Sequence, residues 1–393
     1  MLLFIFLIFT DILVPVIFAR HFPMFRGKKF FALLLFHLIL SLWIWVLLFK
    51  LISWNTFYDD PQHIWLDMCF RGMLAGVVFP RFLIILFHYT GRLIRIRKEG
   101  HSRGFTWTGI AMATVVFAVI AASTFHGRLN FITENVTIPI KGLKKDLDGL
   151  KIVQISDLHM SGFYHHSKAF QQVMERINSY KPDLILNTGD FISYGWREFD
   201  NNDTILAKAK SRYGNYAIMG NHDFGIYEPD YTEADKANNV LIMNNKIKAS
   251  GYRVLNNENV ILNIGQAKLG LAGVETHGRF PNVTHGNLPQ AIKGLDSVDL
   301  RILLSHDPNH WDEAIKNKTN IEITLSGHTH GMQAGIMTRK FKWSPASRFY
   351  PHWAGLYSEK SQYLYVNRGL GVLAIPFRIW MPPEITLITL RSA

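Results

Sequence analysis

The sequence contains little cysteine and little charge, and both shortages limit what the chain can be. Its 393 residues include one cysteine, Cys69, which excludes an internal disulfide and a metal site built from several thiolates. Charged residues make up 18% of the chain, whereas an average soluble domain has about 25%. With 48% apolar residues, the chain is too hydrophobic for disorder and long enough for two or three domains.

The positive charge is concentrated at the N-terminal end. The net charge is +12, and residues 1–130 hold 13 Lys and Arg against 5 Asp and Glu. The remaining 263 residues hold 29 against 25, which is close to balance. Short basic loops between apolar runs are typical of membrane topology. We therefore expect a lipid bilayer as a partner and no nucleic acid.

Four apolar runs precede residue 126. They are Leu2–Ala19, Phe31–Phe49, Gly72–Thr90 and Phe105–Phe125. About 20 apolar residues are enough for a helix to cross the hydrocarbon core of a bilayer. The runs predict a multi-pass transmembrane domain of about four helices over residues 1–126, followed by a connector at 127–147. A cleaved signal peptide is the alternative for the first run, although that run lacks a basic start.

The loops between the runs predict the orientation. The first and third loops are basic, through Arg20, Arg26, Lys28 and Lys29 in one and Arg92, Arg95, Arg97, Lys98 and Arg103 in the other. The second loop carries Asp59 and Asp60 and has no Lys or Arg between Leu51 and Phe70, although Lys50 and Arg71 stand at its two ends beside the runs. The positive-inside rule places the basic loops in the cytoplasm. The C-terminal domain is then expected on the extracytoplasmic side.

Three charged residues fall within or beside the runs: Asp11, Arg71 and Arg81. Charges at membrane depth are costly and therefore mark candidate functional sites. The alternative is an interhelical ion pair, or a side chain that reaches the membrane surface.

From about Thr137 the pattern changes to short strands that alternate with helices. The expected strands are Lys151–Ser156, Asp183–Asn187, Tyr216–Met219, Arg301–Ser305 and Ile323–Ser326. Ser167–Tyr180 and Asn201–Ala209 have helical character, and residues 239–280 are expected to form further strands and turns. This alternation predicts an α/β domain with a buried sheet.

Each of these strands ends at residues that bind metals well. The five strand ends are followed by Asp157-Leu158-His159, Gly189-Asp190, Gly220-Asn221-His222-Asp223, His306 and Gly327-His328-Thr329-His330. Ligands of α/β sheets bind at the carboxyl ends of strands, so these loops can converge. Carboxylate and imidazole groups suit Mn, Fe, Zn and similar divalent ions.

This ordered set resembles the calcineurin-like metallophosphoesterase superfamily. The resemblance extends to the tail, through Asn367-Arg368-Gly369-Leu370-Gly371, Pro376, Arg378 and Pro383-Glu384-Ile385. The tail is similar to a membrane-associated bacterial branch related to UDP-2,3-diacylglucosamine hydrolases. One departure is Met332, where that branch often has glycine. The resemblance implies a four-layer α/β/β/α sandwich over residues 148–393 with two divalent metal ions.

The resemblance also implies a role for each motif residue. The first metal would be held by Asp157, His159 and His330, the second by Asn221, His306 and His328, with Asp190 between them. A metal-bridged hydroxide would attack phosphorus. His222 would protonate the leaving oxygen, and Asp223 would orient His222 or cap a helix. Asn221, Arg368 and Arg378 are candidates for substrate contact, with surface ion pairs as the alternative for the two arginines.

An aromatic segment follows the last motif. It contains Trp343, Phe349, Tyr350, Trp353, Leu356 and Tyr357, mixed with Lys340, Lys342 and Arg348. Aromatic and basic residues together favour a membrane interface or a contact with a lipid tail. Ordinary packing against the sheet is the alternative.

Together these features predict a membrane-anchored, dinuclear metal-dependent phosphoesterase. Its substrate would be a phosphodiester or pyrophosphate, and the four spans favour one that is lipid-linked. The alternative from another class is a non-catalytic membrane sensor with a phosphoesterase-like domain. A transporter with an appended domain is a weaker third hypothesis, because four spans are few.

Overall fold

The computed structural model describes residues 1–22, 27–95, 103–278, 284–338 and 341–393. The chain forms two compact units. The first comprises Met1–Asn55, Leu66–His126 and Ala374–Phe377, and the second comprises Thr56–Trp65, Gly127–Leu373 and Arg378–Ala393. Arg26, Arg97, Lys98 and Lys340, which the sequence arguments use, lie outside the described residues.

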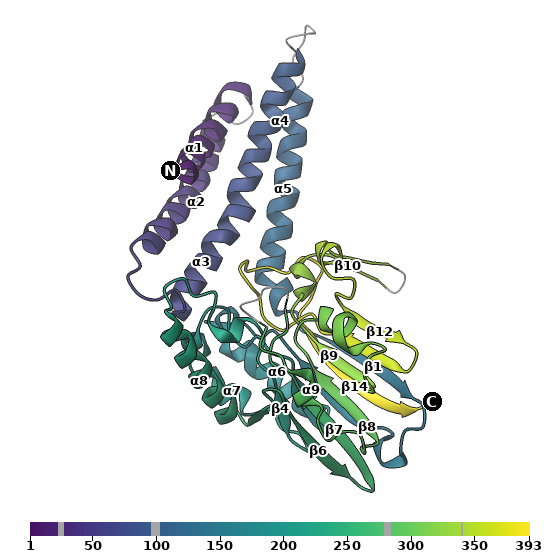
Figure 1. Ribbon diagram of the computed structural model, residues 1–393. Coiled ribbons are helices and arrows are strands. Elements are labelled where there is room, and N and C mark those ends of the chain that lie inside the picture. Colours follow the sequence, from purple (N-terminus) through teal and green to yellow (C-terminus); the bar gives the residue numbers. More distant parts are fainter. Residues whose placement is uncertain (23–26, 96–102, 279–283, 339–340) are drawn as a thin grey trace. The chain divides into compact units, whose positions relative to one another are not determined.

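The first unit is helical. Its helices are α1 (Leu2–His21), α2 (Lys28–Ile52), α3 (Pro61–Met73), a π-helical turn at Leu74–Val78, α4 (Phe79–Arg95) and α5 (Arg103–Phe125) (Figure 1). Among the described residues, four stretches are long and apolar enough to span a membrane: Leu2–His21, Lys28–Ile52, Pro61–Ile94 and Gly104–Leu129. The third starts earlier than the expected Gly72. Its first turns carry His63, Asp67 and Arg71, which a search for apolar runs passes over.

The three charged residues that the sequence singles out in this region are paired. Arg81 Nη1 on α4 lies 2.7 Å from Asp11 Oδ1 on α1. The same carboxylate accepts hydrogen bonds from Ser41 Oγ at 2.6 Å and Trp45 Nε1 at 3.0 Å. Arg71 pairs with Asp67 one helical turn away, at 2.7 Å. The interhelical ion-pair alternative therefore describes Asp11 and Arg81, whereas Arg71 pairs within its own helix.

The second unit contains two six-stranded sheets (Figure 1). The first has the order β1 (Ile132–Ile140), β14 (Glu384–Ser392), β2 (Lys151–Ile155), β3 (Leu184–Asn187), β4 (Asn215–Ala217) and β5 (Tyr252–Val254). The second has the order β12 (Gly355–Glu359), β13 (Gln362–Val366), β9 (Ile323–Ser326), β8 (Leu300–Leu304), β7 (Ala267–Gly273) and β6 (Glu258–Ile264). A separate hairpin pairs β10 (Ile336–Met337) with β11 (Lys342–Trp343).

Buried side chains define the layers. Ile152 and Leu186 of the first sheet share one apolar cluster with Leu271 and Ile302 of the second, so the sheets pack face to face. A second cluster joins the first sheet to helices α6 (Ser167–Ser179), α7 (Asn202–Leu206) and α8 (Glu233–Ala249). A third joins α9 (Leu288–Ala291) to the second sheet. The expected four-layer α/β/β/α sandwich is confirmed.

The directions of the strands bring the loops with the motif residues to common edges of the sheets. Strands β2, β3 and β4 are mutually parallel, and so are β7, β8 and β9. The carboxyl ends of β2, β3 and β4 therefore share one edge of the first sheet, and those of β8 and β9 share one edge of the second. The loops that carry the motif residues all begin at these edges.

One part of the expected pattern was wrong. Residues 239–249 belong to α8, whereas we expected strands and turns. Thr232 and Asp235 form a capping box that starts this helix. Its buried stripe is Asn239, Met243 and Ile247, and the polar first member weakens the apolar periodicity that would have indicated a helix.

Candidate metal centre

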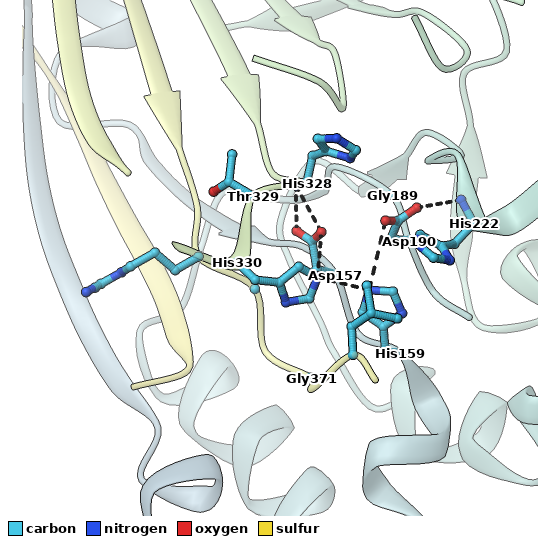
Figure 2. Close-up of polar contacts among 12 residues, drawn as sticks. Asp157, His159, Gly189, Asp190, His222, His328, Thr329, His330 and Gly371 are labelled. Atoms are coloured by element: carbon cyan, nitrogen blue, oxygen red, sulfur yellow. Dashed lines mark hydrogen bonds and ion pairs between the residues drawn. The ribbon is translucent and has the colours of Figure 1, made fainter. Parts of the chain in front are cut away.

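Asp157, His159 and His330 form the first group of candidate ligands (Figure 2). All three are buried. His159 Nε2 lies 3.0 Å from His330 Nε2, and His330 Nε2 lies 3.3 Å from Asp157 Oδ1. Two imidazole nitrogens and a carboxylate oxygen thus face one point, which is an arrangement suited to a divalent cation.

Asp190, His306 and His328 form the second group. His306 Nε2 lies 3.0 Å from Asp190 Oδ2, and the same oxygen lies 3.9 Å from His159 Nε2 of the first group. Asp190 therefore faces both groups. Asn221 Oδ1 is buried and has no hydrogen-bond partner among the described residues. An unsatisfied buried acceptor costs free energy, and a bound cation would satisfy this one.

The other nitrogen of two ligand histidines is held by the chain. His306 Nδ1 donates to the Thr188 carbonyl at 2.7 Å, and His159 Nδ1 lies 3.0 Å from Ser193 Oγ. Such contacts fix the ring and leave Nε2 directed at the site. The donor set and its supporting contacts therefore fit two divalent metal ions.

The backbone of the ligand loops is strained. Five candidate ligands have a positive φ, namely Asp157 (+49°), His159 (+40°), Asp190 (+58°), His328 (+72°) and His330 (+50°). Residues other than glycine seldom adopt this conformation, and it persists only where the surrounding structure imposes it. Strain at this many ligand positions indicates that the loops are built for the site.

The buried carboxylates and imidazoles of the site shift one another's pKa values. Burial opposes the ionisation of Asp157, but His330 and neighbouring imidazoles lower its pKa to about 2. Burial also opposes the protonation of His306, but Asp190 raises its pKa to about 10. In the absence of metal the protonated His306 balances part of the carboxylate charge, and a bound cation would take the place of that proton because a ligating imidazole is neutral.

Asp223 differs from the expectation that it orients His222. Its buried carboxylate accepts backbone N–H groups of Asp190 at 2.9 Å, Phe191 at 2.8 Å, Ile192 at 3.2 Å and Gly220 at 2.9 Å. Asp223 therefore joins the loop that carries Asp190 to the loop that carries Asn221. Burial, and then Asp190, raise the pKa of this carboxyl to about 8.

Ser193 takes the role that we expected of Asp223. His222 Nδ1 donates to the Ser193 carbonyl oxygen at 2.6 Å. The His222 ring also stacks on Tyr227, with centroids 4.2 Å apart, and Tyr227 OH accepts a hydrogen bond from Asn221 Nδ2. Sequence reasoning missed Ser193 and Tyr227, because neither follows a strand within a motif.

Arg368 and Arg378 are bound to other residues of the protein and are not open to a substrate. Arg368 forms ion pairs with Glu384 and Glu134 and is 1% exposed. Arg378 donates to the carbonyls of Arg368, Gly369 and Gly371, and its Nη2 lies 3.3 Å from His330 Nδ1. We assign both arginines to the support of the loops and do not extend the substrate-contact expectation to them.

A short segment between α2 and α3 also belongs to the second unit, which carries the candidate metal ligands and is called the catalytic unit from here on. Asp59 is fully buried, and its carboxylate accepts hydrogen bonds from Tyr231 OH at 2.7 Å and Arg197 Nη1 at 2.9 Å. The neighbouring Glu198 accepts the backbone N–H groups of Ser193, Tyr194 and Gly195. Asp59 thus supports the loop whose Ser193 holds His222. From the sequence alone, Asp59 was used only as an acidic residue of the second loop.

Comparison with known proteins identifies the family. The family model of the calcineurin-like phosphoesterases matches residues 150–332. The metallophosphoesterase YkuE of Bacillus subtilis is 32% identical over 272 residues, which cover 66% of this chain and 85% of the relative. This chain belongs to the calcineurin-like metallophosphoesterase family.

Two further relatives of this metallophosphoesterase are named as a transmembrane protein and as a pyrophosphatase. A transmembrane protein with metallophosphoesterase domain from Danio rerio is 27% identical, over 86% of this chain and 76% of the relative. The UDP-2,3-diacylglucosamine pyrophosphatase LpxG of Chlamydia muridarum is 27% identical, over 62% of this chain and 84% of the relative. The expected enzyme class, a hydrolase acting on phosphoric ester bonds, and the expected membrane protein are confirmed.

Proposed function

We propose that this metallophosphoesterase is a membrane-anchored hydrolase with two divalent metal ions, acting on a lipid-linked phosphodiester or pyrophosphate. The observation that carries the proposal is the pair of three-residue ligand groups with Asp190 facing both. Asp157, His159 and His330 would hold one ion. Asn221, His306 and His328 would hold the other, and Asp190 would bridge them.

The chemistry that two such ions supply is activation of a water nucleophile and neutralisation of charge on the phosphoryl oxygens. The chain's own residues do the rest. His222 is fixed through its Nδ1–H bond to the Ser193 carbonyl, which leaves Nε2 free to act; in the imidazolium form of the ring, Nε2 would donate its proton to the leaving oxygen and the ring would become neutral. Asp223 keeps the Asp190 and Asn221 loops in register through backbone N–H groups of both.

The orientation expected from the loop charges is consistent with the two units. Thr56–Trp65 comprises the connection after α2 and the start of α3, yet it belongs to the same unit as the candidate metal ligands. Two candidate spans, Pro61–Ile94 and Gly104–Leu129, lie between Asp59 and Ile132 of β1, so two crossings would return the chain to one side of a membrane. The segment contains no Lys or Arg. This supports an extracytoplasmic catalytic unit.

The experiment compares hydrolysis of bis-(p-nitrophenyl) phosphate and p-nitrophenyl phosphate by the full chain in detergent, stripped of metal and reloaded with Mn²⁺. We expect Mn²⁺-dependent turnover, with the diester preferred, and its loss in Asp190→Ala. His222→Ala should keep its metal but lose about 10²–10⁴-fold in kcat. The exposed His285→Ala is the matched control. Two bound metals with no hydrolysis of either ester would contradict the proposal and favour the binding-protein alternative.

A further inference from the structure

The catalytic unit exposes a group of large apolar side chains beside the metal centre. They are Met332, Ile336, Phe341, Trp343, Phe349 and Trp380, with exposed fractions between 43% and 69%. We call this group the apolar surface. Exposed apolar residues that gather in one place, unlike single scattered ones, mark interaction sites.

Strand pairing and a buried cluster hold the segments of the apolar surface together. Ile336 of β10 pairs with Trp343 of β11 in an antiparallel hairpin. A bridge between Ala334 and Ile379 brings Trp380 next to the start of this hairpin. Beneath it, a buried cluster is formed by Ala346, Trp353, Ala354 and Met381. Two segments distant in sequence therefore present their apolar side chains from one small substructure.

The backbone supports a functional role. Met332 and Trp380 have φ values of +47° and +50°, where large side chains are unfavourable. Burial cannot account for either conformation, since the two side chains are 43% and 69% exposed. Strained and exposed positions of this kind point to function more than to packing.

The apolar surface adjoins the metal ligands. Met332 follows the ligand His330 by two residues, and Ser344 Oγ donates to the Gly331 carbonyl at 2.5 Å. Tyr350, next to Phe349, has its hydroxyl 2.8 Å from His328 Nε2. A molecule resting on this surface would have its polar end close to the metal centre.

The composition of the surface matches a bilayer interface. Tryptophan and phenylalanine favour the boundary between headgroups and acyl chains, and the exposed Arg348 beside Phe349 complements anionic headgroups. The same chain carries four candidate membrane spans, which keep the catalytic unit at a bilayer. Lipid is therefore an apolar partner to which the catalytic unit always has access.

We propose that the apolar surface inserts into the lipid bilayer and brings the phosphate of a lipid-linked substrate to the metal centre. The insertion of the surface does not depend on the proposed function, whereas the delivery of a substrate rests on it. The sequence feature behind it is the aromatic segment. The structure adds Met332, Ile336, Phe341 and Trp380 to that segment and removes Trp353, which is buried.

The first test measures depth in the membrane without using activity. In a Cys69→Ser background, Phe349→Cys of the full chain is labelled with an environment-sensitive fluorophore and placed in phosphatidylglycerol-containing nanodiscs. We expect blue-shifted emission and protection from a water-soluble quencher. Leu241→Cys, which is 60% exposed on α8, is the matched control and should stay accessible. Equal quenching at the two positions would overturn the proposal.

The second test compares two phosphodiesters that differ only in chain length, hexadecyl p-nitrophenyl phosphate and methyl p-nitrophenyl phosphate. In the variant with both Trp343→Ser and Phe349→Ser, the ratio of long-chain to short-chain kcat/KM should fall about tenfold or more. Leu241→Ser should keep the parental ratio. An unchanged ratio in the double variant would refute substrate delivery. If the parental protein with bound metal hydrolyses neither compound, the proposed function fails, while the labelling still decides insertion.

Discussion

Gly189 lies where the Asp190 loop passes closest to the Asn221 loop, and Gly189→Ala should separate the two. Gly189 has a φ of +98°, and its carbonyl accepts the Asp157 N–H at 2.8 Å. A Cβ at this position would lie 2.5 Å from Gly220 N and 2.8 Å from Gly220 Cα. These neighbours are backbone atoms, so no side-chain rotation relieves the contact.

The magnitude follows from two separable costs. Placing alanine in the left-handed region costs about 1–2 kcal/mol. The backbone clash adds about 1–3 kcal/mol, as overpacking does elsewhere. Gly251→Ala isolates the first cost, because Gly251 has a φ of +82° and a Cβ added there would meet no atom within 4 Å. The difference in unfolding free energy between the two variants should therefore equal the clash alone.

The assay combines thermal unfolding, metal content and phosphodiester hydrolysis of the full chain. Relief of the clash must move the loop carrying Asp190 or the loop carrying Asn221. A displacement of about 1 Å in a catalytic arrangement can reduce the rate about 10²-fold. We expect Gly189→Ala to lose metal and activity, and Gly251→Ala to lose only stability. Parental activity in Gly189→Ala would refute the reasoning.

Three further predictions concern charged side chains that the fold buries or pairs. Asp59→Asn should loosen the Ser193 loop and lower the unfolding free energy by about 1–3 kcal/mol, measured by thermal unfolding and by kcat; Asp60→Asn, which keeps a good helix cap, is the control, and equal behaviour of the two would contradict it. Burial raises the pKa of Glu198 from 4.5 to about 7, so the folded chain binds more protons between these pH values and its stability should fall as pH rises through this window, by up to about 3 kcal/mol. Glu198→Gln should flatten that slope in denaturation measured from pH 4.5 to 7.5, and an unchanged slope would rule out this carboxyl as its source. Asp11→Asn should destabilise the helical unit by leaving Arg81 unpaired, and adding Arg81→Gln should restore part of the melting temperature in detergent; parental stability of the single variant would show that the pair contributes nothing.

The sequence by itself determined the features that depend on local pattern. The four apolar runs predict the candidate spans because hydrophobic length is a property of one continuous segment. The order of the ligand motifs was readable because each motif directly follows its own strand. Parallel strands bring such loops to one edge of a sheet, so the convergence of the motif residues could be predicted from the chain alone, whereas their division into two ligand groups was implied by the resemblance to the family.

Other features were decided by contacts between residues far apart in the chain. Asp223 lies next to His222 in sequence, but its carboxylate turns to the backbone of the Asp190 loop. Arg368 was a candidate for substrate contact until the fold buried it against Glu384 and Glu134. Neither the burial of a charge nor its partner can be read from neighbouring residues, because both depend on which loops the two sheets bring together.

The same dependence on contacts between distant segments explains why the positions of Asp59 and Trp380 could not be predicted from the sequence. Asp59 lies among the membrane helices in sequence, and only the fold joins it to Arg197 and Tyr231 of the catalytic unit. Trp380 reaches the apolar surface through the bridge between Ala334 and Ile379. Local sequence determined which residues can bind metal or lipid, whereas tertiary packing decided which of them meet, since only the folded chain sets distances between separate segments.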